Sequence, residues 1–276
     1  RGIWQIRTGK QGAYIIKLRT YINNRYMDIL IANAAKYETA DFLPADPSWF
    51  MHQVEGKRNQ ETFAFIASAL SYGSRKQFFP KIQYVLDCSA GNVYEWVRSG
   101  EYAHDIPDVA ECYYRLYTKH DMNVFLSRLK ELLCEFGSLE DFARQSVVDG
   151  DAFSLVEAIT AYFRVVATPV IPKNATSSCK RVCMFLRWMV RDGSPVDLGL
   201  WSDFVDKRTL IMPMDTHVVQ EACALGLLSS KSASMNAARK LTRVMAGIFP
   251  DDPLKGDFAL FGYGVDADKT KRTPTK

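Results

Sequence analysis

The sequence lacks the cysteine patterns that define disulfide frameworks and zinc sites. Its 276 residues include only six cysteines, and no two of them form a C-x-x-C pair. Cys179 and Cys183 stand one helical turn apart, but no second cysteine or histidine pair lies near them. Scattered cysteines in a cytosolic protein are expected to be reduced, mostly buried thiols. Because a zinc site needs such pairs, we expect no metal, and we expect no other cofactor.

A long apolar run is also missing. No stretch of 18 uninterrupted apolar residues occurs, so no transmembrane helix is expected. The amino end shows no apolar signal-peptide core followed by a small-residue cleavage site. These absences predict a cytoplasmic protein without a membrane partner, and we expect a monomer.

An excess of positive charge is confined to the two ends. Residues 1–26 carry six basic residues and no acid, and 269–276 carry four more, so 27–268 have a net charge of −6 although the chain totals +4. Bulk charge therefore gives no argument for nucleic-acid binding, which needs a local basic stripe. We interpret 1–26 as an amino-terminal extension, with a genuine structural element as the alternative, and 267–276 as a basic tail.

Strand patterns are scarce, whereas helix boundaries are frequent. Asp46-Pro47 and Asp252-Pro253 each read as an N-cap followed by proline at the first helical position, and Ser138 with Asp141 forms a capping-box pattern. We therefore predict an all-α protein. The expected helices are 27–38, 47–54, 60–72, 75–87, 92–99, 108–118, 121–136, 139–146, 151–166, 178–192, 215–225, 233–247 and 254–262.

The expected helix 178–192 carries a basic stripe. Apolar residues fill one broad face, and Lys180, Arg187 and Arg191 lie on the opposite side. Lys180 lies in the first turn of this helix, where the positive end of the helix dipole and the adjacent Arg181 disfavour an ammonium ion. A partly neutral lysine can attack carbon and form a Schiff base. The alternative is a solvated helix face with ordinary basic side chains.

The segment "PMDTHVVQEACALGL" places an acid at the start of another helix. Pro213 ends the preceding segment, so Asp215 is positioned to cap helix 215–225, with His217 in the first turn. Beside the positive helix end the carboxylate stays ionised, and it can stabilise a developing cation or hold a water molecule. The alternatives are a plain N-cap for Asp215 and a packing role for His217.

Several segments together indicate a family. The segments "FIASALSYGSRKQF", "CKRVCMFLRWMVR", "PMDTHVVQEACALGL" and "FPDDPLKGDFALFGYGV" resemble an uncharacterised bacterial domain family over residues 28–266. That family is distantly related to the helix-hairpin-helix DNA glycosylases, including endonuclease III and the oxidised-guanine glycosylases. The resemblance implies two helical subdomains around a central cleft, one formed by 60–194 and the other by 27–59 with 195–266.

The resemblance also implies a reaction. Lys180 and Asp215 fall on the lysine and aspartate of bifunctional glycosylases. We expect Lys180 to attack C1′ of a flipped, damaged nucleotide in double-stranded DNA, and Asp215 to stabilise the sugar cation. The chain departs from that pattern in three ways: "IPKNATSS" replaces the glycine-rich hairpin turn, the interval between Lys180 and Asp215 is longer, and no four-cysteine cluster follows, so no iron–sulfur cluster is expected.

The remaining site residues are expected to contact DNA. Tyr72 and Arg75, in the loop that relatives insert into the duplex, would fill the gap and bind phosphate, unless Gly73 marks a plain turn. Ser177 and Ser178 would replace the missing glycine amides, and Arg187 and Arg191 would bind the backbone. The expected pocket residues are His217, Trp188 and Phe258, with Phe185 and Phe261 as further candidates, and a core position is the alternative for each aromatic residue.

Two other functions are compatible with the sequence. Under either DNA function we expect a bacterial cytoplasmic protein associated with the nucleoid. A non-catalytic protein that binds DNA structures on the same scaffold is favoured by the changed hairpin and the acidic body, but not by the presence of both Lys180 and Asp215. His104-Asp105, with His52 upstream, faintly resembles the motif of metal-dependent phosphohydrolases. Among these readings, the sequence favours a base-excision DNA glycosylase with lyase activity.

Overall fold

The computed structural model describes residues 24–166 and 168–272, so residues 1–23 of the expected extension lie outside it. The described part is mostly helical, and its only strands form one short hairpin, which confirms the prediction of a predominantly α-helical protein. The α-helices are α2 (Asn24–Tyr37), α3 (Lys57–Leu70), α4 (Arg75–Cys88), α5 (Val93–Ser99), α6 (Tyr102–Asp105), α7 (Lys119–Phe136), α8 (Leu139–Ser146), α9 (Ala152–Phe163), α10 (Lys180–Val190), α11 (Thr216–Ala224), α12 (Met235–Ala246) and α13 (Lys255–Arg272). The 3₁₀ helices are η1 (Ala40–Ala45), η2 (Pro47–Gln53) and η3 (Lys207–Thr209), and the strands are β1 (Cys112–Tyr114) and β2 (Tyr117–Thr118).

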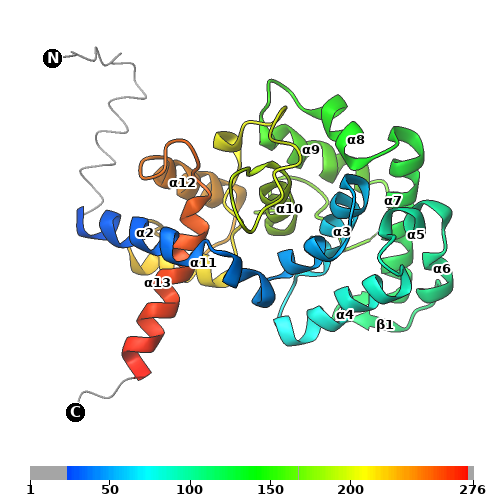
Figure 1. Ribbon diagram of the computed structural model, residues 1–276, viewed down its shortest axis with the longest axis horizontal. Coiled ribbons are helices and arrows are strands. Elements are labelled where there is room, and N and C mark those ends of the chain that lie inside the picture. The colour runs from blue at the N-terminus through cyan, green and yellow to red at the C-terminus, as the bar shows by residue number, and fades with distance from the viewer. Residues whose placement is uncertain (1–23, 167, 273–276) are drawn as a thin grey trace.

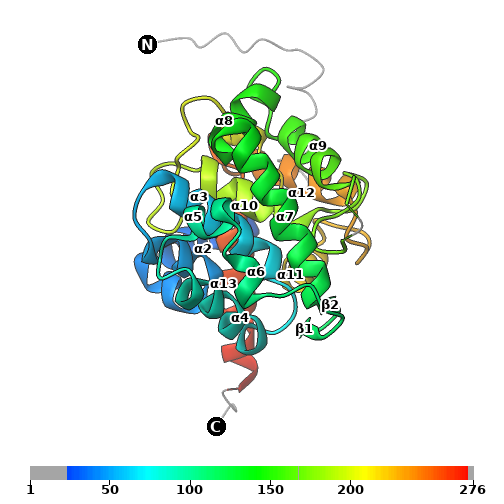
Figure 2. The same ribbon diagram turned by 90° about the vertical axis from the view of Figure 1, so that its right-hand side faces the viewer.

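Helix α10 lies between two groups of helices. At one end of the molecule α13 packs against α2 and α11, and α12 lies close by (Figure 1). At the other end α7 packs against α5 and α8, with the β1–β2 hairpin near its start (Figure 2). One cluster of buried apolar side chains extends from Leu30 to Leu260 and includes both groups. The assignment of residues to two subdomains stays a prediction.

Most of the expected helix starts are made by the expected residues. The Ser138 hydroxyl accepts the amide of Asp141 at 2.9 Å and donates to its carboxylate at 2.6 Å. Asp46 caps η2 ahead of Pro47 by accepting the Ser48 amide at 3.0 Å. Asp252 differs, because α13 begins only at Lys255 and the buried Asp252 carboxylate binds Arg191 instead. A sequence pattern shows the local cap but not the distant cation that competes for the same carboxylate.

The expected helix 108–118 is wrong. This segment contains both strands, β1 and β2, which pair in an antiparallel hairpin with Tyr114 opposite Tyr117. Arg115 stands in the turn with a positive φ of 51°, a backbone conformation that ends any helix. Tyrosine favours strands when it packs on a half-buried surface, and the hairpin tyrosines are buried.

The last helix, α13, is longer than the sequence analysis predicted. Helix α13 continues to Arg272, so residues 267–272 of the expected tail belong to this helix, and 273–276 lie outside the described residues.

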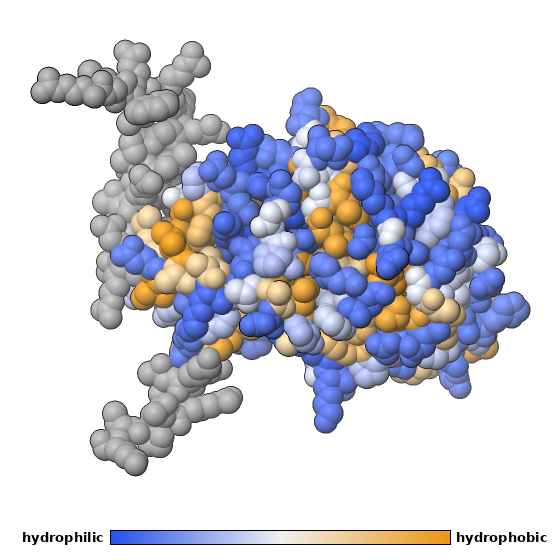
Figure 3. All heavy atoms as spheres, viewed as in Figure 1, coloured by the Kyte–Doolittle hydropathy of each residue, from blue (hydrophilic) through white to orange (hydrophobic). Residues whose placement is uncertain are grey.

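Within the described ranges, none of the helices has the length and apolar character needed to span a bilayer. On the face seen in Figure 3, hydrophobic side chains lie in separate patches among hydrophilic ones.

Candidate active site

A cavity of about 400 Å³ lies where α4, α10, α11 and α13 meet the loop 71–74 and the start of η2. Lys180 and Asp215, which the sequence singles out, both line this cavity. They are 35 positions apart in the chain and open two different helices, so the tertiary structure brings two helix starts to one hollow. The two residues therefore line the same cavity, whereas their chemical roles stay predictions.

Lys180 is the first residue of α10, and the residue before it has an unusual backbone. Cys179 adopts the left-handed region with φ 46° and ψ 37°, which residues other than glycine rarely occupy. Its buried thiol donates to the carbonyl of Asn174 at 3.4 Å. Within the described part of the chain, the Lys180 ammonium takes part in no ion pair or hydrogen bond. The Lys180 amine is therefore available to a ligand in the cavity.

Asp215 acts as the helix cap that its position suggests. Its Oδ1 atom accepts the amide of Val218 at 2.8 Å, which satisfies one of the unpaired donors at the start of α11. A carboxylate can accept hydrogen bonds on both oxygen atoms. Capping through Oδ1 therefore leaves Oδ2 available to the cavity, and the same side chain can both cap the helix and face a ligand.

Asp257 is a cavity residue that the sequence analysis did not identify. It lies in the first turn of α13 and contacts the guanidinium of Arg187. Burial raises the pKa of Asp257 to about 6, and Arg187 opposes this increase while the carboxylates of Asp215 and Asp46 add to it. An acid in the first turn of a helix is ordinarily explained by its favourable interaction with the helix dipole, so the sequence alone gives no reason to assign it a function. Only its burial beside other carboxylates marks it as a candidate acid or base.

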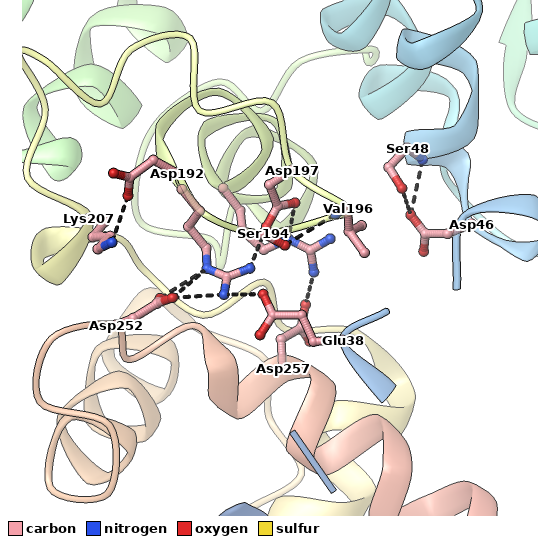
Figure 4. Close-up of polar contacts among 12 residues, drawn as sticks. Glu38, Asp46, Ser48, Asp192, Ser194, Val196, Asp197, Lys207, Asp252 and Asp257 are labelled. Carbon is pink, nitrogen blue, oxygen red and sulfur yellow. Dashed lines mark hydrogen bonds and ion pairs between the residues drawn. The ribbon is translucent and has the colours of Figure 1, made fainter. Parts of the chain in front are cut away.

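The predicted exposed basic stripe is wrong. Arg187 and Arg191 are buried, and both bind Asp197, with Arg187 also bound to Asp257. Arg191 donates to Glu38 at 2.6 Å and to Asp252 at 2.8 Å (Figure 4). These acids come from segments far apart in the chain, whereas a helical projection shows only the face on which a side chain lies. In the described structure the two arginines are therefore buried, ion-paired side chains and not an exposed stripe, although Arg187 also lines the cavity.

The predicted pocket residues divide into two groups. His217, Phe258 and Phe261 line the cavity, whereas Trp188 and Phe185 do not. Trp188 and Phe185 are fully buried core residues, so the pocket prediction is wrong for them. The guanidinium carbons of Arg187 and Arg191 lie 5.0 Å and 5.4 Å from the centre of the Phe258 ring, so this ring is already covered by cations.

Of the predicted DNA-contacting residues Tyr72, Arg75, Ser177 and Ser178, only Arg75 lines the cavity. Arg75 lines the cavity and donates to the carbonyl of Ala45 at 2.5 Å. Tyr72 lies outside it, although both its chain neighbours line it, and its exposed ring faces Arg115 at 4.9 Å. Ser177 and Ser178 also lie outside the cavity, and Ser177 forms a β-bridge with Ser234. The DNA contacts proposed for these four residues stay predictions.

The histidine pattern does not assemble into a metal centre in the part of the chain that the structure describes. His52 lies on η2, where its ring nitrogen contacts the carbonyl of Val196 at 2.9 Å. His104 and Asp105 lie on α6, and the Asp105 carboxylate accepts the indole N–H of Trp96 at 2.8 Å. No group of three or more possible metal ligands comes together there. The phosphohydrolase hypothesis therefore has no site in this region.

Comparison with known proteins identifies a family. The comparisons with curated proteins and with solved structures gave no match. One family model matches residues 46–266, which is more than half of the chain and includes every residue that lines the cavity except Phe42. On this match, the chain belongs to the family described as protein of unknown function (DUF2400).

Proposed function

We propose that this protein is a DNA base-excision glycosylase with lyase activity, and that a flipped, damaged nucleotide binds in the cavity. The observation that supports this proposal is the presence of Lys180 and Asp215 in one hollow, each at the start of a helix. An amine and a carboxylate that act on the same sugar carbon must both reach it directly or through one water molecule. The proposal includes a distant relation to the helix-hairpin-helix glycosylases, with α9 and α10, which pack together, as the hairpin helices.

The proposed reaction begins with the amine of Lys180. Its lone pair attacks C1′, the bond from C1′ to the base breaks, and the base leaves with the bonding electrons and gains a proton. The attached nitrogen loses a proton, and its lone pair then forms a C1′=N bond as the C1′–O4′ bond breaks and O4′ is protonated. The resulting Schiff base is the intermediate of a lyase reaction.

The carboxyl groups of the cavity have different proposed roles. Asp215 carries the negative charge that stabilises the sugar cation as the base leaves. Asp257, whose pKa is about 6, is the proton donor to the departing base. The raised pKa of Asp257 suits its role, because a proton donor must hold a proton that it can deliver.

Borohydride trapping tests this proposal directly. Borohydride reduces a C1′=N Schiff base to a stable amine, which links the protein covalently to DNA. We expect trapping on at least one member of a panel of duplexes that carry oxidised, alkylated or deaminated bases or an abasic site. Lys180→Gln is expected to abolish trapping while leaving duplex binding within about twofold of the wild type, because one neutralised contact removes little of the total phosphate attraction.

Lys57→Gln is the matched control. Lys57 is also the first residue of a helix, α3, but it is exposed and does not line the cavity, so this variant is expected to trap like the wild type. Trapping that survives in Lys180→Gln would exclude Lys180 as the nucleophile. Binding to duplexes without trapping on any substrate would favour the non-catalytic DNA-binding protein instead.

A further inference from the structure

A second hollow region lies on the surface between α9 and α12. One open hollow of about 500 Å³ is lined by α9, the segment 173–176 and α12, and a second of about 530 Å³ is lined by the start of α9, the segment 208–211 and α12. Phe153, Asn236 and Arg239 line both hollows, so the two form one continuous depression, here called the α9–α12 groove.

The groove is rich in unpaired cations. Arg164, Lys173, Arg239 and Arg243 line it, all four are exposed, and none forms an ion pair within residues 24–166 and 168–272. Arg208 also lines the groove but is bound to Asp206 at 2.6 Å. The Arg239 guanidinium lies 3.7 Å from the centre of the Phe153 ring. A guanidinium stacked on a ring keeps its in-plane N–H donors available to oxygen acceptors.

Few acids oppose these cations. Asp151 and Glu157 also line the groove, and Asp151 accepts the Phe153 amide at 3.0 Å as the cap of α9 but keeps its negative charge. The groove therefore sets four unpaired cations against two carboxylates. Residues 27–268 have a net charge of −6, so this local excess opposes the charge of the body and is not part of a generally basic surface.

We infer that the α9–α12 groove binds the phosphate backbone of a DNA duplex. An elongated depression that runs along two helices suits an extended polyanion better than a single small anion. Three of the four unpaired cations are arginines, whose planar donors match phosphate oxygens. This inference rests on the proposed function, because it names the surface that holds the DNA whose damaged nucleotide enters the cavity.

The groove also lies close to the cavity along the chain. Thr176 lines the groove and Lys180 lines the cavity. Four residues of fully extended chain span at most about 14 Å, so the two surfaces approach within a few base steps of each other. The Thr176 carbonyl accepts the Met235 amide at 3.4 Å, which ties this connecting segment to the start of α12. A duplex held in the groove can therefore place a nucleotide at the cavity.

Salt-dependent binding of an undamaged duplex tests the inference. The probe is a fluorescein-labelled 20-base-pair DNA of mixed sequence, titrated with the full chain and followed by anisotropy between 50 and 200 mM NaCl. The variant Arg239→Gln with Arg243→Gln removes two groove cations and keeps good helix formers on α12. We expect about tenfold weaker binding at 100 mM salt, and a decrease of about two in the slope of log affinity against log salt.

The matched control removes the same charge elsewhere. Lys240→Gln with Arg98→Gln changes one exposed lysine on α12 outside the groove and one arginine on α5. It is expected to bind within about twofold of the wild type, since neither of the two side chains lines the groove. Equal losses in both double variants, or no loss in the groove variant, would overturn the inference.

Competition experiments distinguish duplex DNA from other anions as the ligand of the groove. Unlabelled duplex should displace the probe, whereas polyglutamate at equal charge and inorganic phosphate at the same ionic strength should not. Displacement by polyglutamate as efficient as by duplex would overturn the assignment to DNA.

Superimposable circular dichroism melting curves exclude unfolding as the cause of a loss. Loss of binding in the groove variant with no trapping by the wild type would support the groove and reject the proposed chemistry, so the two can fail separately.

Discussion

Glu61 is a carboxyl group buried in the middle of α3. It accepts the amide of Leu139 at 2.9 Å and the indole N–H of Trp201 at 3.2 Å. Burial raises the pKa of Glu61 to about 7 against these hydrogen bonds, which lower it. The native state therefore holds a proton that the unfolded state, with an ordinary glutamate pKa near 4.5, has already lost. Stability from this group is present below about pH 4.5 and decreases as the pH rises to about 7.

Glu61→Gln is expected to flatten that pH dependence. Each pH unit between the two pKa values changes the free energy of unfolding by about 1.4 kcal/mol, so the wild type should lose about 3 kcal/mol more than the variant between pH 4.5 and pH 8. Urea unfolding at a series of pH values measures this difference. At low pH the variant should be less stable by about 1–3 kcal/mol, because its amide cannot accept both hydrogen bonds. Parallel profiles would show that Glu61 is charged in the native state.

Asp257 governs the expected pH dependence of base release. If it donates a proton to the leaving base, the single-turnover rate should decrease as the pH rises through about 6, the pKa of this carboxyl group. Asp257→Asn should be slower by a factor of about 10² and should lose this dependence, because an amide donates no proton. Quenched single-turnover assays between pH 5 and pH 8 measure both effects. A rate and profile like those of the wild type would exclude Asp257 as the donor.

At the scale of the helices, Asp215 both caps α11 and lines the cavity, so a test must separate these two roles. Asparagine caps helices about as well as aspartate, whereas alanine at an N-cap costs about 1 kcal/mol. Asp215→Asn should therefore keep the melting temperature of the wild type, and Asp215→Ala should lower it. Both variants should release base more slowly, because both remove the charge that stabilises the sugar cation. A fully active Asp215→Asn variant would leave Asp215 with the capping role alone.

At the scale of the whole molecule, the buried ion network joins segments that are distant in the sequence. Arg191 at the end of α10 binds Glu38 after α2, Asp197 in the following loop and Asp252 before α13. Removing one partner of a buried ion pair leaves an uncompensated charge, which costs about 3–5 kcal/mol. Arg191→Met is therefore expected to be strongly destabilised in urea unfolding.

Arg208→Met serves as the control for this loss. Arg208 also binds an aspartate, Asp206, but it is exposed and solvent screens the pair, so its removal should leave stability essentially unchanged. If Arg191→Met is as stable as the wild type, the network does not hold the helix groups together. The same network explains why the predicted basic stripe is wrong at Arg187 and Arg191, since their ion pairs with acids hold both side chains in the interior.

The sequence by itself determined the local features of this protein. Helical content, the caps at Asp46, Ser138 and Asp215, and the place of Lys180 at the start of α10 all depend on residues within one or two turns of each other. The hairpin at β1 and β2 was missed because the strand preference of tyrosine depends on packing against neighbouring elements, which the local sequence does not contain.

Only the tertiary structure decided which of these features share a site. It brought Lys180, Asp215 and Asp257 to one cavity, buried Arg187 and Arg191 among acids, and left the cations of the α9–α12 groove unpaired. The reason is physical: a side chain's burial, its ion pairs and the pKa of Asp257 depend on groups that are tens of residues away in the chain. No local pattern contains those contacts, so the sequence indicated candidate residues and the packing of the helices selected among them.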